Sequence, residues 1–134
     1  MADDTPDPQC LIVADADVLI RNALAEYLRH CGYKVLEAAT SDEVVIALEE
    51  GAMKIDALLA DAELAGHYNA FELRIWVRAH HPDVEVVLAG NIDAAAKAAG
   101  HLCDEGPHLQ RPYDPASVAA HIKRLLAATR RQRL

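Results

Sequence analysis

Two aspartates, each directly after a short apolar run, carry the clearest chemistry in the sequence. Asp15 follows residues 10–14, and Asp61 follows the mainly apolar run 55–60. Such runs are typical of parallel strands buried on both faces, whose carboxyl ends meet at one edge of the sheet. If the two strands are neighbours, both carboxylates lie in one crevice. Two hard oxygen ligands beside a nucleophilic carboxylate suit Mg²⁺ and phosphoryl transfer, although aspartate is also a common helix N-cap.

The rest of the chain supplies the elements that would position these aspartates. Helices are indicated by apolar residues at helical spacing, by a capping box at residues 40–43 and by glycines that end the pattern at Gly32, Gly51 and Gly100. Five short strands are predicted, at residues 10–14, 33–38, 55–60, 84–89 and 106–110. Five helices alternate with them, at residues 17–31, 40–51, 71–80, 91–99 and from 115 onward, the last with Asp114 as its N-cap.

Strands that alternate with helices through short connections predict a doubly wound α/β domain, a parallel sheet between two layers of helices. With 134 residues the chain is long enough for one such core. We expect residues 1–9 to be a disordered tail, residues 10–128 to be the folded domain and residues 129–134 to be a basic C-terminal tail.

Composition and charge exclude several classes of function. The net charge is −8, and residues 123–134 hold five of the 13 basic residues and no acid. The first 122 residues are therefore strongly acidic and are not expected to bind nucleic acid. The acidic start and the lack of a long apolar run predict a cytoplasmic protein without membrane contacts. Cys10, Cys31 and Cys103 are far apart and lack a C-x-x-C pair, so we expect buried apolar residues and neither a disulfide nor a zinc site.

Four segments of the sequence resemble the receiver domain of bacterial response regulators, over residues 10–128. They are residues 11–21 (LIVADADVLIR), 32–38 (GYKVLEA), 56–61 (DALLAD) and 111–115 (RPYDP). The resemblance implies a CheY-like, flavodoxin-like (βα)5 fold with sheet order 2-1-3-4-5. It also implies two-component phosphorelay signalling, in which Asp61 accepts a phosphoryl group from a histidine kinase or phosphotransfer protein and a downstream protein responds.

Several site positions depart from the pattern of this family. Ala16 stands where a second acid would hold Mg²⁺, so we expect only weak Mg²⁺ binding, by Asp15, Asp61 and Glu63. Asp17 lies one residue further on, and we expect it to be the N-cap of the first helix, with a role as metal ligand as the alternative.

Three further positions of the implied site are also unusual. Gly90 replaces the Thr or Ser that would contact the phosphoryl oxygen, and Asn91 beside it is expected to be a helix N-cap. Arg111 replaces the family's lysine and presents a planar fork in place of a point charge. His108 occupies the place of the family's switch side chain.

These residues suggest three possible functions. The leading hypothesis is a stand-alone receiver, which is a signalling module and not an enzyme. Ala16 and Gly90 keep open a pseudo-receiver that works without phosphorylation. A phosphatase of the haloacid-dehalogenase type, using Asp15 and Asp17, is disfavoured because the chain is too short for that family's other motifs. Trp76 is expected in the core or on a dimer surface, so a homodimer is one option.

Overall fold

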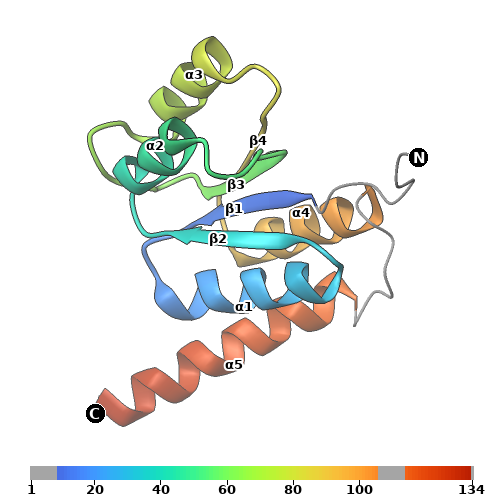
Figure 1. Ribbon diagram of the computed structural model, residues 1–134. Coiled ribbons are helices and arrows are strands. Elements are labelled where there is room, and N and C mark those ends of the chain that lie inside the picture. The colour runs from blue at the N-terminus through green and yellow to red at the C-terminus, as the bar shows by residue number, and fades with distance from the viewer. Residues whose placement is uncertain (1–8, 106–113, 134) are drawn as a thin grey trace, which may run out of the picture.

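The computed structural model describes residues 9–105 and 114–133 (Figure 1). Its elements are β1 (Cys10–Ala14), α1 (Val18–His30), β2 (Lys34–Ala38), α2 (Ser41–Glu50), β3 (Ala57–Asp61), α3 (Ala70–His80), β4 (Glu85–Ala89), α4 (Ile92–Glu105) and α5 (Pro115–Arg133). The four strands lie within two residues of their predicted bounds. The fifth predicted strand, residues 106–110, lies outside the described residues.

The strands form one parallel sheet in the order β2-β1-β3-β4, which confirms the predicted doubly wound class. Ala14 of β1 pairs with Ala60 of β3, and Asp61 pairs with Ala89 of β4. Asp15 and Asp61 therefore follow neighbouring strands at the same edge of the sheet, as the sequence predicts.

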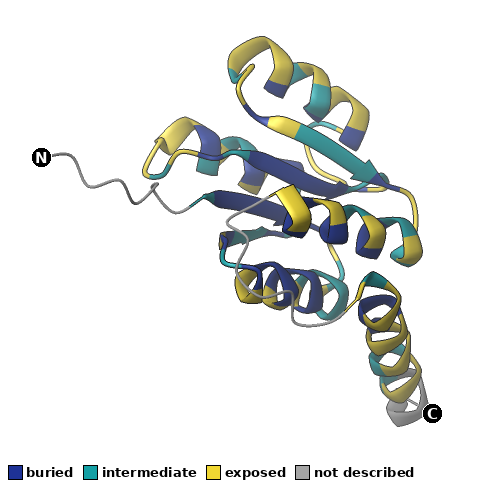
Figure 2. Ribbon diagram, turned by 90° about the vertical axis from the view of Figure 1, so that its right-hand side faces the viewer, coloured by how far each residue is buried: buried dark blue, intermediate teal, exposed yellow. Residues whose placement is uncertain are grey.

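Helices cover both faces of this sheet (Figure 1). On one face α1 and α4 pack against the strands, and α5 lies outside them in contact with both. On the other face α2 and α3 form a second core. Alternate residues of β1 enter the two cores, and all five are buried, as Figure 2 shows for the central strands. Among the described residues, no helix combines the length and apolar character needed to cross a bilayer.

Side-chain caps begin several of these helices. Asp17 accepts hydrogen bonds from the backbone N–H groups of Leu19 and Ile20, which confirms its predicted role as an N-cap. A complete capping box joins Asn69 and Glu72 at the start of α3. The Asn-x-x-Glu pattern of this cap is visible in the sequence. It fixes the start of α3, so the loop after Asp61 runs between the end of β3 and this cap.

One predicted helix end is wrong. α4 does not stop at Gly100 but continues to Glu105. Gly100 instead permits a close contact between helices, since a Cβ there would lie 2.3 Å from Cγ of Pro115 in α5. α5, for which the sequence predicts only a start, extends to Arg133. Alanine and arginine favour helix in this segment.

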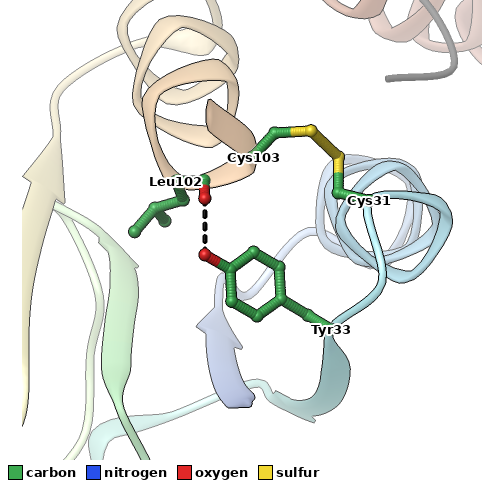
Figure 3. The surroundings of a disulfide bond; sticks show 4 residues. All are labelled: Cys31, Tyr33, Leu102 and Cys103. Atoms are coloured by element: carbon green, nitrogen blue, oxygen red, sulfur yellow. Dashed lines mark hydrogen bonds between the residues drawn. A yellow bond between two sulfur atoms is a disulfide. The ribbon is translucent and has the colours of Figure 1, made fainter. Parts of the chain in front are cut away.

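The prediction that the cysteines form no disulfide is also wrong. Cys31, directly after α1, is bonded to Cys103 in α4, with their Cα atoms 5.4 Å apart (Figure 3). The two cysteines are 72 positions apart, so the sequence does not reveal the pair, whereas the packing of α1 beside α4 brings them together. Cys10 is a free, buried cysteine on β1, as predicted.

The contact at Gly100 predicts that Gly100→Ala destabilises the protein, because the added methyl group overpacks the boundary between α4 and α5 at a cost of about 1–3 kcal/mol. This loss should exceed the gain of about 1 kcal/mol that alanine brings to a helix interior. Urea unfolding of the variant measures the difference. Gly90→Ala is the matched control, since a Cβ at Gly90 meets nothing within 4 Å. A Gly100→Ala protein as stable as wild type would contradict the packing argument.

Candidate functional site

A cavity of about 190 Å³ opens at the carboxyl ends of β1, β3 and β4, between α1 and α4. Its lining includes Asp15, Asp61, Glu63, Gly90 and Asn91. The structure therefore brings together the described members of the predicted site. The first residues of α4 form part of its wall, because Ile92 and Ala95 also line it.

Asp15 lies deepest among the acidic side chains of this cavity, with 8% of its surface exposed. Its Oδ1 accepts a hydrogen bond of 2.8 Å from the backbone N–H of Asp17. Burial raises the pKa of Asp15 to about 6; the hydrogen bond from Asp17 opposes this effect, and the negative charge of Asp61 adds to it. A neutral, protonated Asp15 is therefore accessible under mildly acidic conditions.

Arg21 holds the backbone at Asp15 in place, a role that was not predicted from the sequence. Its Nη1 donates a hydrogen bond of 3.0 Å to the backbone carbonyl of Asp15, while its Nε lies 3.3 Å from Oε1 of Glu37 on β2. The sequence carries no clear signal for this role, because Glu37 is 16 positions away on another element. Arg21 thus connects α1, β2 and the end of β1.

Asp61 ends β3 and is only half-buried. Its Oδ1 accepts a hydrogen bond of 3.2 Å from the backbone N–H of Glu63, and its backbone carbonyl accepts one from Leu64. The N–H of Ala62 donates to the carbonyl of Ala89. The backbone therefore fixes the Asp61 carboxylate while leaving it accessible from the cavity, which is what a nucleophile requires.

The loop after Asp61 is anchored on the start of α2. The fully buried Ser41 hydroxyl donates to the carbonyl of Tyr68 and accepts from its N–H, at 2.7 and 3.2 Å. Gly66 has φ +137°, and a Cβ there would lie 2.2 Å from Oγ of Ser41. The role of Ser41 is not apparent from the sequence, because the residue occupies an ordinary first-turn position of the capping motif.

Gly90 and Asn91 border the cavity where β4 leads into α4. A side chain at Gly90 would enter open space, so the described structure does not require a glycine there. Oδ1 of Asn91 accepts a hydrogen bond of 2.8 Å from the N–H of Ala94, as predicted for an N-cap. The predicted residues His108 and Arg111 lie outside the described residues.

Trp76 lies on α3, away from this cavity. It is half-buried, and its ring stacks on those of Tyr68 and His80, with centroids 6.4 and 4.9 Å apart.

The cavity offers carboxylate oxygens, the ligand atoms that Mg²⁺ prefers, but only a few of them. Asp15 and Asp61 supply carboxylates from neighbouring strands, and Glu63 is exposed at the rim. Within residues 9–105 and 114–133, no group of three His, Cys, Asp or Glu side chains is placed to hold a metal ion. Mg²⁺ in proteins commonly keeps several waters and only one or two carboxylates, so Asp15 and Asp61 are the residues that would hold it.

The raised pKa of Asp15 predicts a pH-dependent effect of Asp15→Asn in Mg²⁺-free buffer. In the unfolded chain this carboxyl ionises near pH 3.8, whereas in the folded protein it ionises near pH 6. Between these values the folded state binds more protons, so the wild type loses stability as pH rises. The variant avoids this loss and should be more stable by about 1–3 kcal/mol at pH 7.

Chemical unfolding of both proteins from pH 3.5 to 8 measures this difference, which should vanish near the lower limit. Asp83→Asn, at an exposed position, controls for the simple loss of one acid. A difference between Asp15→Asn and wild type that does not vary with pH would contradict the assigned burial effect.

The chain is similar to several known proteins over most of its length. No protein-family model matches it. The transcriptional regulatory protein GltR of Pseudomonas aeruginosa is 28% identical over 122 residues, covering 87% of this chain and 48% of that protein. The chain spans about half the length of the curated relatives it matches.

Two solved structures show the same fold. The chemotaxis response regulator CheY4 of Vibrio cholerae superposes with a TM-score of 0.58 at 18% identity, covering 87% of this chain and 98% of that one. The signal receiver domain of an HD domain-containing protein from Pseudomonas fluorescens gives a TM-score of 0.60 at 18% identity, covering 99% and 98%. At these identities the structures support the fold, while the curated relatives are response regulators.

Proposed function

Because the chain belongs to the CheY-like receiver domains of response regulators, we propose that it serves two-component signalling by accepting a phosphoryl group on Asp61. The observation that carries this proposal is the placement of Asp61. Its carboxylate ends β3 in a cavity that it shares with Asp15 of the neighbouring strand, and the backbone N–H of Glu63 orients it.

The proposed step transfers a phosphoryl group from a phosphohistidine of a kinase or phosphotransfer protein. A carboxylate oxygen of Asp61 attacks phosphorus, a P–O bond forms as the P–N bond breaks, and the imidazole leaves with the electron pair. Mg²⁺, when bound by Asp15 and Asp61, would offset the negative charge on the phosphoryl oxygens. The family resemblance assigns the balancing cation to Arg111 and the response of the switch side chain to His108.

The phosphatase alternative is less well supported by the local structure. A general acid at Asp17 would need a carboxyl group directed at the reacting atoms. Oδ1 of Asp17 instead accepts hydrogen bonds from Leu19 and Ile20 as the cap of α1.

Asp61→Asn should abolish covalent labelling by acetyl phosphate and Mg²⁺, because it removes the nucleophile while keeping the shape of the side chain. Intact-protein mass spectrometry measures the gain of one phosphoryl group. Asp15→Asn is the control that weakens the metal site but keeps the nucleophile, so it should label more slowly and not at zero rate.

Two results would count against phosphorylation of Asp61. One is labelling that persists in Asp61→Asn. The other is a folded wild type that takes up no phosphoryl group from acetyl phosphate or from phosphorylated histidine kinases, which would leave a pseudo-receiver.

Restoring the missing acid by Ala16→Asp should make stability depend on Mg²⁺. Residue 16 is exposed beside Asp15, so a third carboxylate repels the other two and lowers the melting temperature without metal. Mg²⁺ that binds only the folded state stabilises it by mass action. Thermal melts with and without millimolar Mg²⁺ should therefore show the deficit shrinking or reversing.

Ala16→Asn is the uncharged control for this comparison. If Ala16→Asp gains no more from Mg²⁺ than wild type does, the cavity does not bind the metal through these residues.

A further inference from the structure

The disulfide lies at the far end of a helix whose beginning borders the proposed phosphorylation site. Asn91, Ile92 and Ala95 line the cavity, whereas Cys103 lies in the last turn of α4 and is bonded to Cys31 after α1 (Figure 3). A change in the attachment of α4 at Cys103 can therefore reach the cavity along one continuous helix.

Non-covalent contacts hold α4 on α1 only modestly. Most buried residues of α4 are small, and Leu102 is the one large aliphatic side chain among them. The buried residues of this helix are Ala95, Ala96, Ala99, Gly100, Leu102 and Cys103. Small side chains bury little apolar area, so each contributes little. α4 also contacts α5, where the ion pair between Lys123 of α5 and Asp93 of α4 is exposed and contributes little.

We propose that Cys31 and Cys103 form a reversible redox switch, which fixes α4 on α1 when oxidised and loosens it when reduced, and thereby changes the wall of the cavity around Asp61. The redox response stands independently of phosphorylation, whereas its effect on Asp61 rests on the proposed function.

The exchange partner is a small-molecule disulfide such as oxidised glutathione. One cysteine thiolate attacks a glutathione sulfur and releases one glutathione thiolate, which leaves a mixed disulfide. The second cysteine thiolate then attacks the protein sulfur of that mixed disulfide and releases the second glutathione. The two protons of the cysteine thiols end on the two glutathiones, and reduced glutathione reverses both steps.

The location of the pair makes this exchange selective. Cys10 packs in the core under α2 and α3, across the sheet from the disulfide, so it cannot reach either sulfur without unfolding. Cys31 and Cys103 are themselves buried, so exchange requires the last turn of α4 to open. The Tyr33 hydroxyl donates a hydrogen bond to the carbonyl of Leu102 in that turn and holds it closed (Figure 3).

The first experiment equilibrates the full chain in glutathione buffers of varying ratio and counts free thiols by mass after alkylation in denaturant. Wild type should pass between one and three free thiols in a single two-electron transition, and Cys10→Ser should show the same transition with one thiol fewer. Tyr33→Phe should reach equilibrium faster, because the turn that covers the sulfurs opens more readily. A bridge that persists in excess reduced glutathione, or never forms in oxidised glutathione, overturns the proposal.

The second experiment compares hydrogen exchange of the oxidised and reduced protein. Amides in the second half of α4 should exchange about tenfold faster or more after reduction, while those of β1 and β3 stay protected. Equal exchange of α4 in both states overturns the switch. Cys31→Ser should match the reduced wild type in either buffer, and if this variant fails to fold, the reduced wild type provides the comparison.

Acetyl phosphate labelling of both states then tests the link to Asp61. We expect the labelling rate to differ severalfold between the oxidised and reduced protein. Equal, non-zero rates overturn the link. If neither state is labelled although α4 responds to reduction, the proposed function fails and the redox response stands.

Discussion

The parallel pairing of β1 with β3 is the constraint on which the rest of the structure depends. Because Ala14 lies opposite Ala60, the residues that follow them, Asp15 and Asp61, must leave the sheet at the same edge. With neighbours on both edges, β1 is a central strand, and its residues are buried on both faces of the sheet. This burial depends on the helices that cover the two sides. The position of the two carboxylates is thus a consequence of how the core is covered.

The same edge gives its two aspartates different properties. Asp15 is buried and desolvation raises its pKa, whereas Asp61 is half-buried and keeps access to the cavity. Two identical side chains on neighbouring strands therefore suit different tasks. One can serve as an interior ligand, and the other can meet an incoming group.

Local signals in the sequence predicted the four described strands, the N-caps at Asp17 and Asn91, and the cluster at the sheet edge. These features depend on residues close together in the chain or on the periodicity of burial. The prediction failed at Gly100 and at the Cys31–Cys103 bond, where partners far away in the sequence decide the outcome. A glycine that ends a helix and one that lets another helix approach look the same until the second helix is placed.

The contact between Ser41 and Gly66 has a consequence for how this sequence can diverge. The hydroxyl occupies the space that a Cβ at residue 66 would need, and the positive φ of Gly66 disfavours any other residue there. A side chain at residue 66 therefore requires both the loss of the Ser41 hydroxyl and a change in the loop backbone. Paired changes at these two positions should accordingly accompany remodelling of the loop that follows Asp61.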